Sequence, residues 1–262
     1  MMRALWTSAS GMMTQQFNMD VLSNNLANVN TTGFKKSRAE FQDLLYEHLR
    51  RPGTIDSMGQ QLPLGVEVGH GAMPSATQKI FSQGEIQITN NPLDILVNGE
   101  GFFQIAMPDG SLNYTRAGNF KMDGNGRVAT NDGHPLEPAL TIPAEATGLV
   151  IRENGQVEIT LPQGQANQVV GQIMLAKFMN NAGLESQGNN LFSATDASGE
   201  VMVGQPGADG IGKVGQGMLE NSNVQVVEEM VNLIVTQRAY EANSKAIKAS
   251  DDMLSEANNL RS

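Results

Sequence analysis

The sequence contains the stretch Asn24-Asn25-Leu26-Ala27-Asn28-Val29-Asn30-Thr31-Thr32-Gly33-Phe34-Lys35, which closes an amphipathic run that begins near Leu5. Four apolar residues of the run stand seven positions apart: Leu5, Met12, Met19 and Leu26. A seven-residue repeat is typical of helices that pack along other helices. Gly33 supplies a stop for such a helix. The pattern predicts an N-terminal helix that depends on a partner for its stability.

Three amides near the end of this helix, Asn24, Asn25 and Asn28, allow two interpretations. Asparagine is a mediocre helix former, so the amides are explained by fraying and capping. They also suit a ladder of side chains that bonds neighbouring helices and fixes their register. The sequence favours neither.

A second helix is expected over Val226 to Leu260, because neither glycine nor proline follows Gly217. Its apolar residues again recur every seven positions: Val226, Leu233, Tyr240, Ile247 and Leu254. The helix would be about 50 Å long. The two terminal helices can pair but cannot cover each other completely, so further helices should come from other copies. A polar cluster on the second helix is either a solvated face or the partner surface of the first amide cluster: Gln237, Arg238, Tyr240, Glu241 and Asn243.

The chain between the helices has a different character. Residues 34–51 place Phe41, Leu44, Leu45 and Leu49 at helical spacing, which predicts a short helix ending at Pro52-Gly53. From about Val66 to Gly217, short alternating apolar runs are separated by tight-turn sequences: Pro108-Asp109-Gly110, Asp123-Gly124-Asn125-Gly126, Asn131-Asp132-Gly133 and Asn154-Gly155. This pattern predicts a central antiparallel β domain, so the fold class is α+β.

Composition narrows the range of functions. The formal net charge of -10 argues against a nucleic-acid partner, which would need a basic face. The chain has no cysteine, and its three histidines show no metal-binding spacing. The N-terminal residues lack the apolar core of a secretory signal peptide, and no stretch approaches the ~20 apolar residues of a membrane span. We expect export without a cleaved signal peptide and no direct membrane span.

One glycine-rich stretch imitates nucleotide-binding sequences. Gly207-Ala208-Asp209-Gly210-Ile211-Gly212-Lys213-Val214 nearly matches a phosphate-binding loop, but Val214 stands where Ser or Thr should follow the lysine. We therefore expect a glycine-rich connector between the β domain and the helix. No acid, base, nucleophile and metal set converges, so neither enzymatic activity nor a cofactor is expected.

Four stretches resemble the bacterial flagellar rod and hook protein family in the family's own order. The first is the opening stretch of residues 24–35, and the last is residues 237–245, Gln-Arg-Ala-Tyr-Glu-Ala-Asn-Ser-Lys. Residues 91–103, from Asn-Pro-Leu-Asp to Gly-Phe-Phe, and residues 114–120, Tyr-Thr-Arg-Ala-Gly-Asn-Phe, resemble the entry to the family's middle domain.

This resemblance implies a domain order and a function. The expected domains are residues 1–33 and 218–262, forming an inner helical rod domain, a connector over 34–76 that is extended or helical, and a central β domain over 77–217. The resemblance implies a structural subunit of the distal rod, which assembles helically into the hollow drive shaft between motor and hook. The alternatives are a proximal rod protein or an adhesin-like β module that oligomerises through its helical ends.

The resemblance also implies partners and a location. The partners would be other copies of the chain, other rod proteins below, the hook protein above, the outer ring proteins and the flagellar export apparatus. The location would be the periplasmic rod of the flagellar basal body. The residues expected at contacts between subunits are Leu5, Met12, Met19, Asn24, Asn25, Leu26, Asn28, Phe34, Leu233, Gln237, Arg238, Tyr240, Asn243, Ile247 and Leu254.

Overall fold

The computed structural model describes residues 2–53, 63–161 and 168–259 and divides the chain into two compact units. The helical unit comprises Met1–Ala27, Ser37–Gln78 and Gln225–Ser262. The β unit comprises Asn28–Lys36 and Lys79–Val224. Two helices and antiparallel strands confirm the predicted α+β class.

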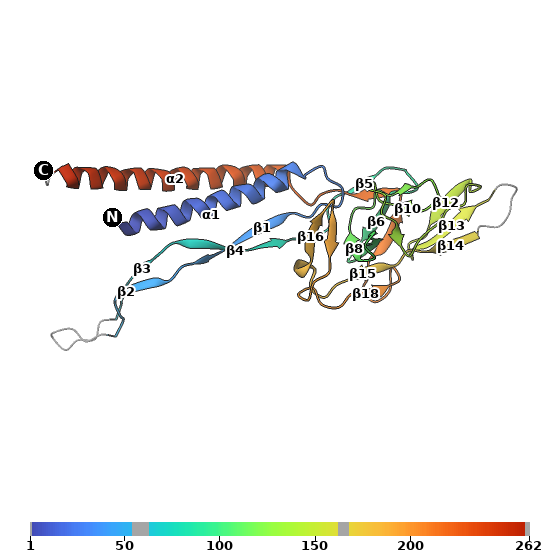
Figure 1. The fold of residues 1–262 in the computed structure, drawn as a ribbon, viewed down its shortest axis with the longest axis horizontal. Helices are drawn as coiled ribbons and strands as arrows, with labels where there is room; N and C mark the ends of the chain where they lie inside the picture. The colour runs from blue at the N-terminus through green and yellow to red at the C-terminus, as the bar shows by residue number, and fades with distance from the viewer. Residues whose placement is uncertain (1, 54–62, 162–167, 260–262) are drawn as a thin grey trace. The chain divides into compact units, whose positions relative to one another are not determined.

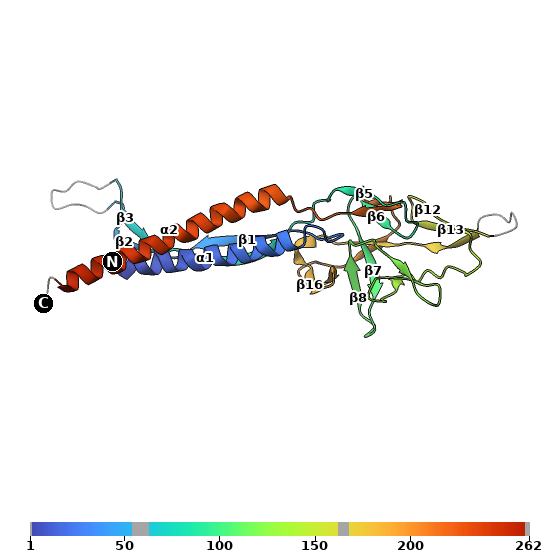
Figure 2. The same cartoon turned by 90° about the horizontal axis from the view of Figure 1, so that it is seen from above.

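The helical unit is built on α1 (Met2–Ala27) and α2 (Val226–Asn259). Figures 1 and 2 show the two helices running alongside each other in opposite directions. Both predicted terminal helices are therefore present. Glu228 and Glu229 occupy the first turn of α2, where carboxylates interact favourably with the helix dipole.

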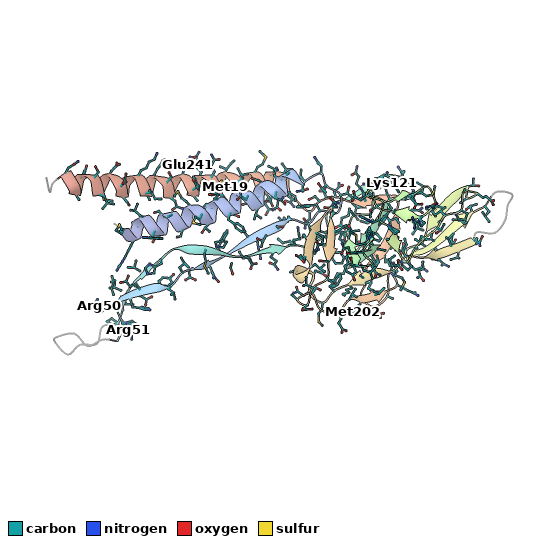
Figure 3. The ribbon with its side chains drawn as sticks, viewed as in Figure 1. Met19, Arg50, Arg51, Lys121, Met202 and Glu241 are labelled. Atoms are coloured by element: carbon teal, nitrogen blue, oxygen red, sulfur yellow. The ribbon has the colours of Figure 1, made fainter. Side chains whose placement is uncertain are left out.

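The connector is a β ribbon, so the short helix predicted within residues 34–51 is wrong. β1 (Ser37–Asp43) pairs with β4 (Ala72–Lys79), and β2 (Tyr46–Arg50) pairs with β3 (Val66–Gly69). Figure 3 places Arg50 and Arg51 toward the end of this ribbon. The apolar spacing suited a helix, but long-range strand pairing satisfies the backbone groups of both chain segments instead.

The β unit holds one seven-stranded sheet and four smaller groups of strands. The large sheet has the order β16 (Glu185–Gly188), β17 (Leu191–Ser193), β8 (Leu112–Thr115), β7 (Phe102–Ala106), β15 (Leu175–Lys177) and β18 (Met202–Gly204), with β11 (Leu136–Glu137) also paired to β7. The other groups are β12–β13–β14 (Gly148–Ile151, Gln156–Thr160, Gln168–Gln172), β9–β10 (Lys121–Met122, Val128–Ala129), β6–β19 (Ile95–Asn98, Lys213–Gln216) and β5–β20 (Ile86–Ile88, Met218–Glu220). A 3-10 turn, η1, covers Asn181–Gly183.

The predicted turns join antiparallel strands. Residues 108–110 connect β7 to β8, and residues 154–155 connect β12 to β13. In the turn between β9 and β10, Asp123 Oδ1 accepts the backbone N–H groups of Asn125 and Arg127, which confirms a hairpin turn there. A buried aliphatic and aromatic core that includes Phe103, Ile105 and Leu175 fills this unit.

Candidate functional site

The packed face of α2 has a regular composition. Its least exposed side chains recur in steps of three and four residues: Glu229, Leu233, Thr236, Tyr240, Asn243, Ile247, Ser250 and Leu254. These are the two inward positions of a heptad. Apolar and polar residues alternate in this series. The packed face of α2 therefore consists of one apolar row and one polar row.

The polar half of α2 faces small and polar residues of α1. Asn25 Nδ2 donates to Glu229 Oε2 over 3.3 Å, and Asn18 Nδ2 donates to Thr236 Oγ1 over 3.0 Å. One heptad further, a Cβ added to Gly11 would lie 2.8 Å from Asn243 Nδ2, so the helices approach closely there. We call these three pairs the polar row: Gly11, Asn18 and Asn25 with Asn243, Thr236 and Glu229.

Asn25 joins three elements of the helical unit. Its side chain is 1% exposed, and Glu229 is 3% exposed. Besides the bond to Glu229 on α2, the Asn25 amide donates to the Ser37 carbonyl over 2.8 Å and accepts the Ser37 N–H over 2.9 Å. The amide therefore ties the end of α1 to the start of β1 and to the first turn of α2. Asn25 thus fits the ladder interpretation, between helices of one chain, whereas Asn28 Oδ1 accepts the Thr31 hydroxyl just beyond the helix end, which fits the capping interpretation.

The structure separates the fifteen predicted contact residues into three groups. Asn25 and Phe34 are buried within their own units, and Asn28 Oδ1 accepts a hydrogen bond from Thr31. The half-buried residues are Leu5, Met12, Met19, Leu26, Leu233, Tyr240, Asn243, Ile247 and Leu254. The exposed ones are Asn24, Gln237 and Arg238, and Glu241, labelled on α2 in Figure 3, is exposed with them. Their role between subunits stays a prediction.

The outer face of α2 carries apolar residues that sequence periodicity did not single out. Val227, Met230, Val231, Ile234 and Val235 are each at least half exposed and follow the spacing of one helix face. On α1, Met2, Trp6 and Met13 are 67%, 73% and 71% exposed. An apolar face of this size in water indicates a surface that another protein covers.

The ribbon carries a second exposed apolar surface. Leu45 is 86% exposed and Leu64 is 77% exposed, with Leu49 and Val66 also exposed on the paired strands β2 and β3. A two-stranded ribbon with leucines in solvent is marginal by itself. Its apolar side chains gain stability only from a further surface.

A buried ionic cluster in the β unit was missed by sequence reasoning. Lys35 Nζ lies 2.5 Å from Glu220 Oε1 and donates to the Ser82 carbonyl over 2.7 Å. Arg116 Nε donates to Glu220 Oε2 over 3.0 Å. Burial lowers the pKa of Lys35, and the neighbouring Glu220 carboxylate opposes that shift. The only signal was that Lys35 and Arg116 lie in two of the family-like stretches.

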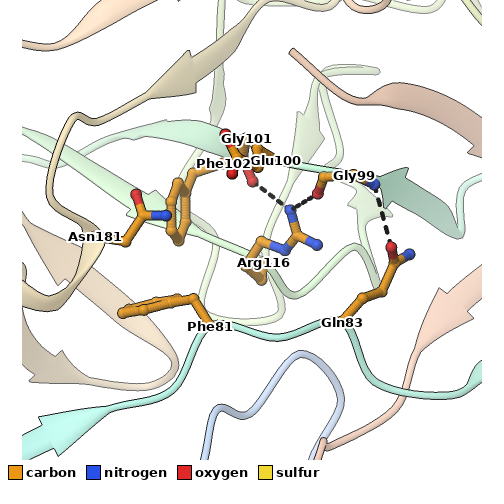
Figure 4. A pocket seen from close by; sticks show the side chains of 8 residues that line it. All are labelled: Phe81, Gln83, Gly99, Glu100, Gly101, Phe102, Arg116 and Asn181. Atoms are coloured by element: carbon orange, nitrogen blue, oxygen red, sulfur yellow. Dashed lines mark hydrogen bonds between the residues drawn. The ribbon is translucent and has the colours of Figure 1, made fainter. Parts of the chain in front are cut away.

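The remaining donors of Arg116 bond to backbone carbonyls. The guanidinium reaches Gly99 O at 2.7 Å and Gly101 O at 2.6 Å, as Figure 4 shows, and Val97 O at 3.3 Å. A cavity of about 240 Å³ adjoins it, lined in part by Phe81 and Phe102. Because the guanidinium is fully engaged, it offers this cavity no free donor for an anion.

The backbone of Gly33 also contacts the buried ionic cluster of Lys35, Arg116 and Glu220. It adopts φ +70, and a Cβ there would lie 2.5 Å from the Ala117 nitrogen. Its N–H also donates to the Glu220 carbonyl over 2.7 Å. The glycine of the first family-like stretch thus packs on the Arg116-Ala117 backbone of another.

The nucleotide-like stretch has a structural role. Residues 207–212 form turns between β18 and β19, and Lys213 begins a strand and not a helix. Lys213 Nζ lies 2.8 Å from Glu153. The stretch is a turn within the β unit, so its predicted place between the β domain and the helix is wrong. Among the described residues there is no group of three acidic, histidine or cysteine side chains that could hold a metal, and no helix long and apolar enough to span a membrane.

Three segments match known families. Residues 5–35 match the family described as flagella basal body rod protein, residues 96–159 match the flagellar hook protein FlgE/F/G D1 domain, and residues 216–260 match the flagellar basal body rod FlgEFG protein C-terminal domain.

Relatives match along the whole chain. The flagellar basal-body rod protein FlgG of Borreliella burgdorferi is 49% identical over 263 residues, covering 100% of this chain and 99% of the relative. The protein of the same name in Caulobacter vibrioides is 47% identical over 262 residues, covering 100% of both chains. The flagellar hook-basal body complex protein FlhP of Bacillus subtilis is 30% identical over 274 residues, again covering 100% of both.

Proposed function

Because the chain belongs to the family of flagellar basal-body rod proteins, we propose that it is a structural subunit of the distal rod. Copies assemble helically into a hollow shaft that transmits torque from the motor to the hook. The role is mechanical and needs no catalytic group or cofactor.

The observation that carries the proposal is the apolar outer face of the helix pair. The α1–α2 contact leaves Val231, Ile234 and Trp6 in solvent. Burial of such side chains stabilises by about 1.5–3 kcal/mol each, so neighbouring helices gain free energy by covering them. A contact between different surfaces of successive copies generates a filament when its rotation does not close into a ring, and the proposal is that this contact stays open.

The ribbon supplies a second contact in this proposal. Leu49 lies on β2, Leu45 and Leu64 lie just before β2 and β3, and all three are exposed within the helical unit. We place this surface on adjacent subunits, where it would stiffen the rod.

The names of the relatives support the further partners. Relatives are named for the basal-body rod and the hook-basal body complex. The proposed neighbours are other rod proteins below, the hook protein above and outer ring proteins around the shaft, in the periplasm. Delivery by the flagellar export apparatus without a cleaved signal peptide belongs to the same proposal.

The test is complementation of a flagellated bacterium that lacks its own copy of this protein. Val231→Glu with Ile234→Glu should abolish swimming and leave basal bodies without a complete rod, because charge is placed on the outer face of α2. The matched control is Leu112→Glu with Met202→Glu, which alters similarly exposed apolar residues in the β unit, opposite Ala106 and Lys177 on the neighbouring strands. Complete rods from the α2 variant would overturn the proposal.

A further inference from the structure

We propose that the polar row sets the register of the α1–α2 pair and thereby fixes which apolar side chains the pair presents to neighbouring copies. The register is a property of the single chain. Only its consequence for neighbours rests on the proposed function.

The apolar half of the interface cannot choose a register by itself. Leu5, Met12 and Met19 repeat every seven residues on α1, and Leu233, Tyr240 and Ile247 do so on α2. A slip of one heptad moves the helices by about 10 Å and brings another apolar member of the α2 repeat to each inward position along α1. Hydrophobic burial alone therefore stabilises several registers to a similar extent.

The polar row distinguishes these registers. A slip in either direction separates Asn25 from Glu229, although both side chains are nearly fully buried. In one direction Asn18 comes opposite Glu229, and the Asn25 amide leaves its α2 partner behind. In the other direction Glu229 passes the end of α1 at Ala27, and Asn18 comes opposite Asn243, where the native pair has Gly11 without a Cβ. Buried polar groups that lose hydrogen-bond partners destabilise the slipped states, and single polar residues at heptad positions are known to specify register in this way.

Asn25 links this choice to the rest of the helical unit. Its two hydrogen bonds to Ser37 fix the amide against β1, so the group that meets Glu229 has a set position on α1. A slipped pair would shift Val231 and Ile234 of α2 along α1 by two helical turns. Neighbouring copies would then meet a different outer face.

The absence of cysteine allows a direct measurement of register. Asn25 to Asn18 and Glu229 to Thr236 are both steps of seven, and continuing these steps places Ala4 opposite Ser250. In the purified full chain, Ala4→Cys with Ser250→Cys should give an intramolecular cross-link with a short bismaleimide. Ala4→Cys with Ala257→Cys, one heptad away, should not. Efficient cross-linking of the second pair and not the first would overturn the proposal.

A second experiment removes the polar row from the variant that carries Ala4→Cys and Ser250→Cys. Asn18→Leu with Asn25→Leu should retain the helical circular-dichroism signal but lose most of the Ala4–Ser250 cross-link, because several registers become populated. The control, Gln16→Leu with Ser23→Leu, makes the same kind of change on exposed positions of α1 and should keep the cross-link.

An unchanged cross-link yield in the Asn18→Leu, Asn25→Leu variant would contradict a register-setting role. If that variant loses its helical signal, Asn18→Leu alone takes its place, and the same loss of yield is expected. The cross-link is read on single chains, so its failure is distinct from a failure of rod assembly.

Discussion

At the scale of single residues, the cluster around Glu220 joins side chains that no local pattern connects. Lys35 is 185 positions from Glu220, and Arg116 is 104 positions away. Sequence reasoning works from periodicity and spacing, and neither reports contacts over such separations. The family-like stretches around Lys35 and Arg116 were visible, but their meeting at one carboxylate required the fold.

Glu220→Gln should lower the free energy of unfolding of the β unit by about 3–5 kcal/mol. The substitution removes the carboxylate that contacts both Lys35 and Arg116, and an uncompensated buried charge is strongly destabilising. Urea denaturation followed by circular dichroism measures the change. Glu153→Gln, which breaks the exposed pair with Lys213, is the control and should have a much smaller effect, because water screens an ion pair on the surface. Equal effects of the two substitutions would contradict a structural role for the cluster.

At the scale of secondary-structure elements, periodicity predicted the helices well and the ribbon poorly. The seven-residue repeats of Leu5 to Leu26 and of Leu233 to Leu254 correspond to α1 and α2. Residues 34–51 also have helical spacing, but β1 and β2 form there because distant strands pair with them. Repeats show a local preference, whereas a two-stranded ribbon depends on a partner segment whose position the sequence does not reveal.

The polar half of the helix interface was only partly foreseen. Asn24, Asn25 and Asn28 stand out in the sequence because amides are unusual near a helix end. A ladder of amides between helices is one of the two interpretations that they allow. Thr236 and Glu229 carry no comparable signal in the sequence, because both are ordinary residues on a helix surface. Burial of Glu229 became evident only from the contact with Asn25.

The ribbon offers a test at this scale. Leu45→Glu with Leu49→Glu should change the unfolding free energy of the subunit by less than about 0.5 kcal/mol, because substitutions of exposed residues have small effects. The same variant should weaken rod assembly if neighbouring copies cover these leucines. Thermal unfolding and sedimentation of assembled protein measure the two effects. A large loss of subunit stability would show that the leucines pack within their own chain.

At the scale of the whole molecule, the helical unit and the β unit differ in how much apolar surface they expose. The helical unit carries the larger share of the exposed apolar side chains, on α1, on α2 and on the ribbon, although the β unit also exposes some, such as Ile88 and Met179. The β unit has its own buried core and ionic cluster. Assembly should therefore depend chiefly on the helical unit.

The most direct measurement is electron microscopy of the purified full chain over rising concentration, beside the Val231→Glu, Ile234→Glu variant. The account predicts straight hollow tubes from the native chain above a threshold concentration and none from the variant. The Leu112→Glu, Met202→Glu control should form tubes as the native chain does. A closed ring or dimer from the native chain, or tubes from the α2 variant, would contradict the claim that the outer helix face drives open-ended assembly.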